Sequence, residues 1–353
     1  MYERVADLPL TIDSYDLELQ ERRTSSGFVR ATTTVSLHGD GATGRSEDVT
    51  YDREDHVPFV GDFDADLAGE YTLDSFSDHL DDVDLWPEPA TRSPSKHYRR
   101  WAFEAAALDL ALRQADTDLA SALDRSMDDV RFVVSTRIDV DEDGEEIAPS
   151  TGRVDAWLDV DPSLEFKLDP TPAWDDAIVE ALAATDAVRI LDLKGLYEND
   201  EVRPPADPDT YRRVLEGFPD AVVEDPRLTD ETEAIVRGHE ARISWDYPIT
   251  GVESIEELPF EPHWLNIKPS RFSTVESLLD AIEYALENDV ALYGGGQFEL
   301  DVGRGQIQCL ASLCYPDGPN DVAPGGYNDP EPAPDLPTSP LDVAGDSAGF
   351  GLH

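Results

Sequence analysis

Lysine is almost absent from this chain, so the few lysines that remain are the first candidates for chemistry. The sequence has 27 basic residues against 77 aspartates and glutamates, and only four of the basic residues are lysines. Arginine stays protonated at ordinary pH, whereas a lysine whose pKa is lowered by its surroundings can accept and release a proton. Lys167, Lys194 and Lys268 lie in or beside short strand-like segments of the second half. We therefore expect Lys167 and Lys268 to transfer protons.

Carboxylates end three of these strand-like segments. Glu224 follows Asp192 by 32 residues and Asp246 follows Glu224 by 22, which is about one strand–helix unit in each case. The carboxyl ends of the strands of a parallel barrel share one face, so these three side chains are expected to meet there. Three carboxylates suit Mg²⁺, a hard cation that prefers oxygen ligands.

A metal ion flanked by two lysines indicates removal of a proton next to a carboxylate. Loss of the α proton leaves an enediolate with extra negative charge, which a divalent cation on the carboxylate oxygens would stabilise. Neighbouring positive charge lowers the pKa of a lysine and lets it act as a base. A lysine on each face of the substrate permits racemisation or epimerisation. A single lysine base permits β-elimination or cycloisomerisation.

The elements that must position these residues alternate in type. From about residue 130, short apolar runs alternate with helical windows, which is typical of a parallel sheet buried on both faces. Seven such runs favour a closed barrel, and an open doubly wound sheet stays as the structural alternative. No Gly-x-Gly-x-x-Gly follows the first run, which counts against a dinucleotide fold. The runs span residues 131–137, 164–168, 188–193, 221–225, 241–246, 263–268 and 290–295.

The segments on either side of this repeat have a different character. Residues 11–20 and 27–39 predict strands, and residues 39–51, rich in glycine and acids, predict a mobile loop. Residues 101–116 predict a helix that is apolar on more than one face and therefore lies buried between layers. Residues 315–353, rich in proline and glycine, predict an irregular segment whose apolar end can dock.

The formal charge of −50 excludes two classes of partner. Nucleic acid and an anionic membrane would both repel such a surface, and no apolar run reaches the roughly 18 residues of a membrane span. Acids spread over the whole chain indicate adaptation to high salt, where screening removes most of the repulsion. No secretory signal pattern is visible, so we expect a cytoplasmic protein. Cys309 and Cys314 are expected to be buried free thiols.

The strand-end residues lie in motifs that resemble those of a known family, the enolase superfamily. The muconate lactonizing enzyme-like subgroup is the most similar, and it also includes o-succinylbenzoate synthases, N-acylamino acid racemases and dipeptide epimerases. The ordered set of motifs is more specific than any single one. In chain order the motifs are VRILDLKG, AVVEDP, ISWD, LNIKPS and GGGQFELDVGRGQIQCLASL.

This resemblance covers nearly the whole chain and implies a fold. It predicts an α/β protein with a TIM-type (β/α)7β barrel over residues 126–325. An α+β capping domain would be formed by residues 1–125, including the helix that leads into the barrel, and by the C-terminal segment 326–353, which returns to it.

The resemblance also assigns roles to the strand-end residues. It implies that Asp192, Glu224 and Asp246 bind Mg²⁺, with Mn²⁺ as an alternative. Lys167 matches the second lysine of the family's Lys-x-Lys pair, and Lys268 matches the lysine of the sixth barrel strand. Both would therefore be catalytic.

Three further residues are expected to bind the substrate, a small-molecule carboxylate. Glu299 matches the acid of the seventh-strand region, and Gly295 lies in the glycine-rich strand end before it. Lys194 stands where asparagine is usual in the family. It would either contact the substrate or replace a charge that is lost elsewhere.

That lost charge is the main departure from the family pattern. The first lysine of the Lys-x-Lys pair is replaced by Glu165, so the positive charge that helps to lower the pKa of Lys167 is missing. This motivates an alternative, a metal-binding protein of the same fold that has lost turnover and acts in binding or assembly. Barrels of this kind often associate, so a homo-oligomer stays open.

Overall fold

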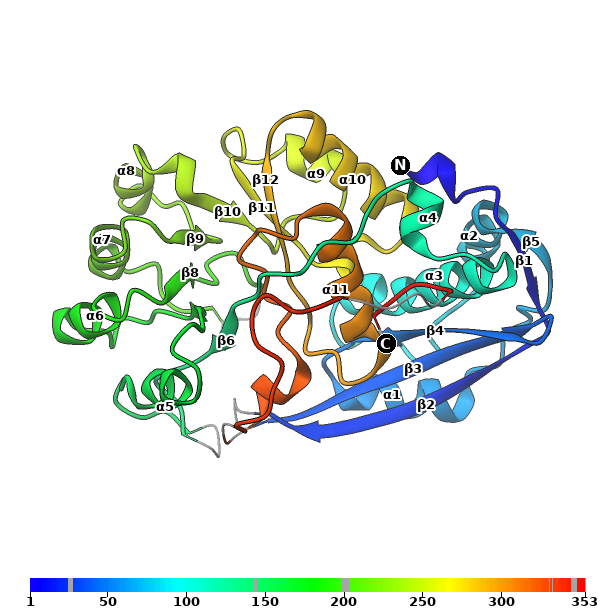
Figure 1. The fold of residues 1–353 in the computed structure, drawn as a ribbon, viewed down its shortest axis with the longest axis horizontal. Helices are drawn as coiled ribbons and strands as arrows, with labels where there is room; N and C mark the ends of the chain where they lie inside the picture. The colour runs from blue at the N-terminus through cyan, green and yellow to red at the C-terminus, as the bar shows by residue number, and fades with distance from the viewer. Residues whose placement is uncertain are drawn as a thin grey trace.

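A parallel sheet of seven strands curls through the second half of the chain, with helices on its outer side (Figure 1). Neighbouring strands follow one another in sequence, in the order β6 to β12, and one helix follows each strand. A helix after each strand returns the chain to the starting edge, as parallel pairing requires. The computed structural model describes residues 1–24, 28–141, 145–198, 203–329, 331, 333–343 and 348–352.

The strands are short and their carboxyl ends share one edge of the sheet. They are β6 (Val134–Thr136), β7 (Phe166–Leu168), β8 (Val188–Asp192), β9 (Val222–Glu224), β10 (Ile243–Trp245), β11 (Trp264–Ile267) and β12 (Ala291–Gly294). The helices that follow them are α5 (Gly152–Val160), α6 (Asp176–Ala183), α7 (Pro208–Gly217), α8 (Thr232–Val236), α9 (Val252–Glu256), α10 (Val275–Glu287) and α11 (Val302–Cys314). Every residue of β7, β9 and β10 is buried, so a polar side chain there needs a polar partner.

The two edges of the sheet pair with two consecutive residues, one at each edge. Asp321 forms a parallel bridge with Gly295, directly after β12, and Asn320 forms one with Phe132, just before β6. The Asn320 side chain is fully buried and accepts a hydrogen bond from the Gly294 backbone N–H at 2.7 Å. The segment therefore lies between the first and last strands of the sheet.

The N-terminal half is built from antiparallel sheets and helices. Strands β2 (Ser14–Arg23), β3 (Val29–Gly39) and β4 (Ala42–Asp48) form a meander, and β1 (Pro9–Ile12) pairs with β5 (Gly69–Thr72). The β3–β4 turn has Asp40 and Gly41 at φ values of 49° and 77°, as Asp-Gly hairpin turns require. The helices are α1 (Arg53–Asp62), α2 (Leu73–Asp81), α3 (Ser95–Gln114) and α4 (Leu119–Leu123). Single 3-10 turns are η1 (Tyr2–Arg4), η2 (Glu240–Arg242), η3 (Pro269–Phe272) and η4 (Gly325–Asn328).

The predicted loop at residues 39–51 is wrong, because most of it is strand β4. Two of its acids, Glu47 and Asp48, are buried and paired, whereas Asp40 is exposed in the β3–β4 turn. Asp48 lies 2.8 Å from the guanidinium of Arg99, and Glu47 accepts the backbone N–H of Leu300 at 2.6 Å. Acid-rich composition therefore does not indicate a loop where distant donors satisfy the carboxylates.

The C-terminal segment returns to the N-terminal half. The Phe350 ring meets Trp101 of α3 edge-on at 6.5 Å, and the Phe350 backbone N–H donates to Asp109 of the same helix at 2.7 Å. Leu352 N–H donates to the carbonyl of Gly305 in α11. The chain end thus lies between α3 and α11, where Figure 1 draws it in red beside both helices.

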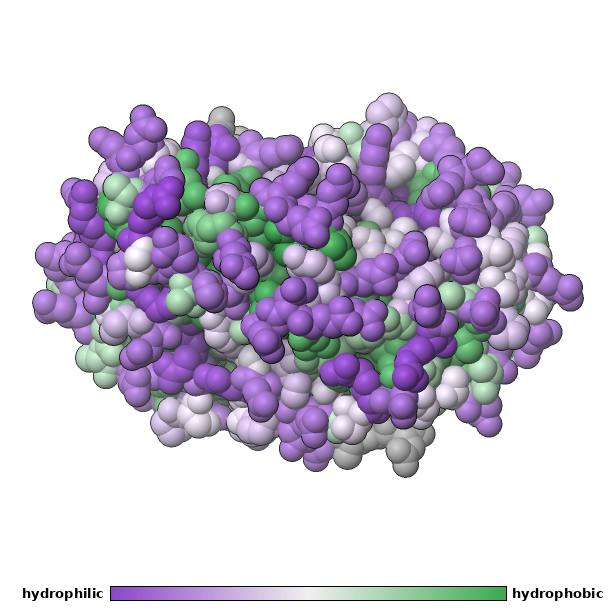
Figure 2. Space-filling model, turned by 90° about the horizontal axis from the view of Figure 1, so that it is seen from above, coloured by the Kyte–Doolittle hydropathy of each residue, from purple (hydrophilic) through white to green (hydrophobic). Residues whose placement is uncertain are grey.

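The hydrophilic surface and the two buried thiols agree with what the sequence composition predicts. Hydrophilic residues cover most of the face shown in Figure 2. In the part of the chain that the structure describes, no helix has the length and apolar character needed to span a membrane. Cys309 and Cys314 are buried free thiols, as predicted.

Candidate active site

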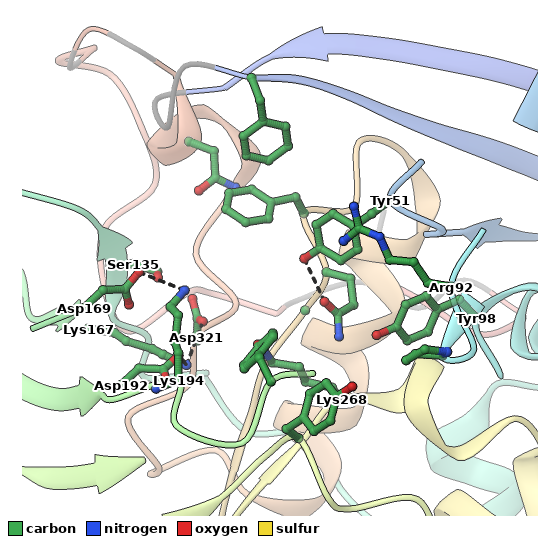
Figure 3. Close-up of a pocket in the computed structure, with 18 of the residues that line it drawn as sticks. Tyr51, Arg92, Tyr98, Ser135, Lys167, Asp169, Asp192, Lys194, Lys268 and Asp321 are labelled. Carbon is green, nitrogen blue, oxygen red and sulfur yellow. Dashed lines mark hydrogen bonds and ion pairs between the residues drawn. The ribbon is translucent and has the colours of Figure 1, made fainter. Parts of the chain in front are cut away.

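A cavity of about 730 Å³ lies at the carboxyl ends of the strands and is lined by both halves of the chain (Figure 3). Four of the eight predicted site residues line it: Lys167, Asp192, Lys194 and Lys268. The other four lie outside that lining: Glu224, Asp246, Gly295 and Glu299. Glu224 and Asp246 are fully buried, and the lysines that contact them separate them from the cavity.

Lys167, on β7, forms a buried ion pair with Glu224, on β9. Its Nζ donates to the two carboxylate oxygens at 2.7 and 2.9 Å and lies 3.5 Å from Asp192 Oδ2. Glu224 also accepts hydrogen bonds from Asn266 Nδ2, at 3.2 Å, and from the Tyr293 hydroxyl. Lys167 is therefore the cation of this pair, and the other two donors are neutral.

Asp246, directly after β10, contacts two cations. Lys268 Nζ lies 2.9 Å from Asp246 Oδ2. The Arg271 guanidinium reaches both oxygens, with Nη2 3.2 Å from Oδ2 and Nε 3.1 Å from Oδ1. The turn η3 brings Arg271 back over the strand end, and its guanidinium carbon lies 4.9 Å from the centre of the Tyr247 ring. The two lysines therefore sit beside acids with different surroundings.

The residues that depart from the family pattern do not add positive charge beside Lys167. Lys194 Nζ lies 2.8 Å from Asp169 Oδ2, so its charge is neutralised there. The carboxylate of Glu165 points to Arg131 and Arg189, each at 2.6 Å. In this arrangement neither position supplies the charge that would lower the pKa of Lys167.

Gly295 and Glu299 support neighbouring groups. A Cβ atom on Gly295 would lie 2.9 Å from Lys268 Cε, so glycine leaves room for that side chain. Glu299 Oε1 accepts the backbone N–H of Gln297 at 2.6 Å, and its Oε2 lies 3.5 Å from Arg304 Nη2. These contacts hold the segment between β12 and α11 against the cavity.

The carboxylates keep both lysines protonated. Burial disfavours the charge of Lys167, yet Glu224 and Asp192 raise its pKa well above the usual value. Burial also disfavours the charge of Lys268, yet Asp246 raises the pKa of this lysine well above the usual value. Burial and neighbouring acids raise the pKa of Glu224 to about 7, although Lys167 opposes this. A lysine in this state donates protons and does not accept them.

The donor set suits a divalent cation, although its carboxylates are occupied by lysines. Among the described residues, no group of three or more His, Cys, Asp and Glu side chains is arranged to hold a metal ion. However, Asp246 Oδ1 is buried and makes no hydrogen bond, although Arg271 Nε lies 3.1 Å away as an ion-pair partner. Buried acceptors are rarely left in this state. The carboxyl ends of β8, β9 and β10 supply Asp192, Glu224 and Asp246, which are oxygen donors of the kind that Mg²⁺ prefers.

The charges of the site point the same way. Within the described residues, the acids at the strand ends outnumber the bases that contact them. The acids are Asp169, Asp192, Glu224, Asp225, Asp246 and Asp321, and the bases are Lys167, Lys194, Lys268 and Arg271. With all of them ionised, six negative charges would face four positive ones. Burial and neighbouring acids raise the pKa of Asp225 well above its usual value and that of Glu224 to about 7, so a proton on either acid reduces the excess that a divalent cation would balance.

Sequence reasoning missed Arg271 and Asp225. It considered the residues at the end of each strand-like run and chose Glu224 rather than Asp225 from the run 221–225, whereas Arg271 lies one turn beyond Lys268. Pro269 was a usable signal, because proline begins turns and stops the strand. Asp225 follows Glu224, and its two oxygens accept the backbone N–H groups of Asp246 and Tyr247, each at 2.9 Å.

Two family models match the sequence. The C-terminal domain of the family described as "Domain of unknown function (DUF8230)" matches residues 126–329, and its N-terminal domain matches residues 3–122. Among curated proteins, none matches the chain by sequence.

Solved structures that share this fold include members of the enolase superfamily. A member from Listeria innocua is 18% identical over 90% of this chain and 86% of its own, with a TM-score of 0.64. A muconate lactonizing enzyme is 17% identical over 88% of each chain, with a TM-score of 0.63. A mandelate racemase/muconate lactonizing protein from Herpetosiphon aurantiacus is 16% identical over 89% and 88%, with a TM-score of 0.64.

Proposed function

Because the chain belongs to the DUF8230 family and shares the fold of the enolase superfamily, we propose that it is a divalent-metal-dependent enzyme. It would remove the proton α to a substrate carboxylate. The observation that carries this proposal is the placement of Lys167 and Lys268 in one cavity. Their strands, β7 and β11, have three strands between them, and the three candidate ligands stand at the ends of those strands.

The two lysines would divide the proton transfer. One Nζ accepts the α proton from one face of the substrate, and the other returns a proton to the opposite face. Each lysine becomes a base only when its partner carboxylate is neutralised, because that carboxylate holds it protonated. A divalent cation held by Asp192, Glu224 and Asp246 would supply this neutralisation and stabilise negative charge on the substrate carboxylate. We propose Mg²⁺, with Mn²⁺ as an alternative.

The reaction classes that fit are racemisation or epimerisation, dehydration of the o-succinylbenzoate synthase type, and cycloisomerisation of the muconate type. Lysines on both faces favour the first class. Lys194, which lines the cavity, and Glu299, which supports its wall, remain candidate substrate-binding residues. Gly295 is proposed to act indirectly, by leaving space for Lys268.

The proposal also covers the domain architecture of the protein, its cellular location and its oligomeric state. The bridges to Asn320 and Asp321 support a closed (β/α)7β barrel over residues 126–325. Contacts of the C-terminal segment with α3 support a capping domain formed by residues 1–125 and 326–353. Adaptation to high salt, a cytoplasmic location and homo-oligomer formation stay predictions from the sequence.

One observation favours a second candidate, a metal-binding protein of this fold without turnover. Glu165 is bound by two arginines, and Lys194 is bound by Asp169. Neither of these two positions therefore gives Lys167 a second cation that would lower its pKa. This candidate predicts tight Mg²⁺ binding with no proton exchange on any carboxylate.

Deuterium incorporation at Cα, followed by proton NMR, separates the two candidates. The protein is incubated in D₂O with molar KCl and Mg²⁺ and with pools of chiral carboxylates, including N-acylamino acids and dipeptides. Lys167→Ala and Lys268→Ala are compared with Lys96→Ala, which removes an exposed lysine of α3. Mg²⁺ binding is measured by calorimetry on the same samples.

The proposal predicts exchange that needs Mg²⁺, that Lys96→Ala retains, and that falls at least a hundredfold in the other two variants, as expected for loss of a general base. Exchange that is unchanged in Lys167→Ala and Lys268→Ala would contradict the assigned roles. Mg²⁺ binding without exchange in any pool would favour the protein without turnover.

A further inference from the structure

The wall of the cavity that follows β12 carries buried polar atoms without hydrogen-bond partners. They are Gln297 Nε2, Arg304 Nε and Glu299 Oε2, the last of which has an ion-pair contact with Arg304 Nη2 at 3.5 Å. Gln297 and Arg304 line the cavity, and Gln297 is 2% exposed. Polar groups this deeply buried are almost always paired in folded proteins, so unpaired ones at a cavity wall indicate a missing ligand.

The N-terminal half fixes the orientation of the Gln297 carboxamide. The Tyr51 hydroxyl donates to Gln297 Oε1 at 2.8 Å, which leaves the Nε2 group as the free donor. Arg30, fully buried, packs its guanidinium over the Tyr51 ring at 4.4 Å and donates from Nε to the Gln297 carbonyl at 3.1 Å. In Figure 3, Tyr51 lies on the side of the cavity away from Lys167 and Asp192.

The surroundings hold this donor in place. The Gln297 backbone N–H donates to Glu299 Oε1. A Cβ atom on Gly296 would lie only 2.2 Å from Glu299 Oε2, so glycine lets the carboxylate pack against the backbone. Phe298 adopts a left-handed φ of 57° and meets Phe28 edge-on at 5.6 Å, and both rings line the cavity. The donor therefore stands beside an apolar surface on a segment that is already ordered.

We propose that Gln297 determines specificity by donating a hydrogen bond to an sp² oxygen of the substrate, remote from the carboxylate held at the lysines. This oxygen belongs to a carbonyl or to a second carboxylate, and the part of the substrate beside Phe28 and Phe298 is apolar. The inference rests on the proposed function, because it assigns the reacting carboxylate to the lysine end. Arg304, whose Nε is also unpaired, is the second donor of the same wall.

Pairs of probes that differ by one oxygen group test this inference by binding alone. Calorimetry in molar KCl with Mg²⁺ compares 4-oxo-4-phenylbutanoate with 4-phenylbutanoate, and suberate with octanoate. The first pair adds a carbonyl and the second adds a carboxylate, so the arms distinguish the two sources of the oxygen. We expect the wild-type protein to prefer the oxygen-bearing member of at least one pair by about three- to tenfold, as one hydrogen bond allows.

Three variants assign the preference to a residue. Gln297→Glu keeps the size of the side chain but replaces the donor with an acceptor, so it reverses the preference for suberate. Tyr51→Phe keeps the ring beneath Arg30 and removes the hydroxyl that orients the amide, so it reduces the preference in part. Gln20→Leu removes a carboxamide from β2, outside the cavity lining, and leaves the preference unchanged.

Each outcome decides a different point. A wild-type preference that Gln297→Glu abolishes supports the inference, and the pair that shows it names the oxygen. Equal binding of both members of each pair, or a preference that survives in Gln297→Glu and Tyr51→Phe, overturns the inference alone. No binding of any of the four carboxylates, with the protein folded and Mg²⁺ present, overturns the inference together with the carboxylate site on which it rests.

Discussion

The two lysine–carboxylate pairs beside the cavity look alike but differ in how much each acid depends on its lysine. Glu224 has Lys167 as its cation, and its remaining donors are neutral. Asp246 has Lys268 and also the permanent charge of Arg271. Both acids are fully buried. Loss of Lys167 would therefore leave the charge of Glu224 without a cation, whereas loss of Lys268 would leave Asp246 paired with Arg271.

The largest effect is expected from Lys167→Met. It leaves Glu224 buried with neutral donors, and a buried charge that loses its partner costs about 3–5 kcal/mol. The free energy of unfolding, measured by urea denaturation at pH 8 in molar KCl with EDTA, should fall by this amount. The exposed control Lys96→Met should change it by less than about 0.5 kcal/mol. A loss below about 1 kcal/mol in Lys167→Met would show that Glu224 does not depend on this lysine.

The pH dependence of Glu224 should be the next largest effect. Its pKa is about 7 in the folded protein against an ordinary value of 4.5, so the folded state binds more protons between these values. The stabilisation is complete below about pH 4.5 and is lost as pH rises through 7, a change on the order of 2–3 kcal/mol. In EDTA, the stability of the wild type relative to Glu224→Gln should therefore fall from pH 4.5 to 7. A difference that stays constant with pH would refute the assignment.

Lys268→Met should cost least. Arg271 still neutralises Asp246, so the expected loss is that of one hydrogen bond to a charged group, about 1–2 kcal/mol. The same urea experiment measures it at pH 8. If Lys268→Met destabilises the protein as much as Lys167→Met does, the guanidinium does not compensate Asp246 and the two pairs are equivalent.

The strand ends could be predicted from the sequence because their pattern is local. Continuous apolar runs separated by helical windows indicate parallel strands, and the residues at the end of each run then fall at one edge of the sheet. That reasoning placed Lys167, Asp192, Lys194 and Lys268, which all line the cavity. The scarcity of lysine made the lysine assignments more specific, whereas acids are too frequent in this chain for a single one to be informative.

The contacts of the N-terminal segment that supports the site could not be predicted, because the partner residues come from distant parts of the chain. Nothing in the acidic segment that forms β4 shows that Asp48 meets Arg99, or that Glu47 caps backbone groups near Leu300. The sequence around Tyr51 likewise does not indicate that its hydroxyl contacts Gln297. The Glu47 and Tyr51 contacts join the two halves of the chain, and the Asp48 contact lies within the N-terminal half. All three follow from packing rather than from local periodicity.

The central claim is that the carboxylates hold Lys167 and Lys268 protonated until a divalent cation replaces the two lysines as the partner of these carboxylates. Because the chain has four lysines, a sample labelled with ¹³C at lysine Cε gives four signals, which Lys→Arg variants assign. Their pH titration, with EDTA and then with saturating Mg²⁺, reports each pKa directly. The account predicts that Lys167 and Lys268 titrate above the ordinary lysine value in EDTA and that Mg²⁺ lowers both pKa values while Lys96 is unchanged. Titrations of Lys167 and Lys268 that are the same with and without bound Mg²⁺ would contradict it.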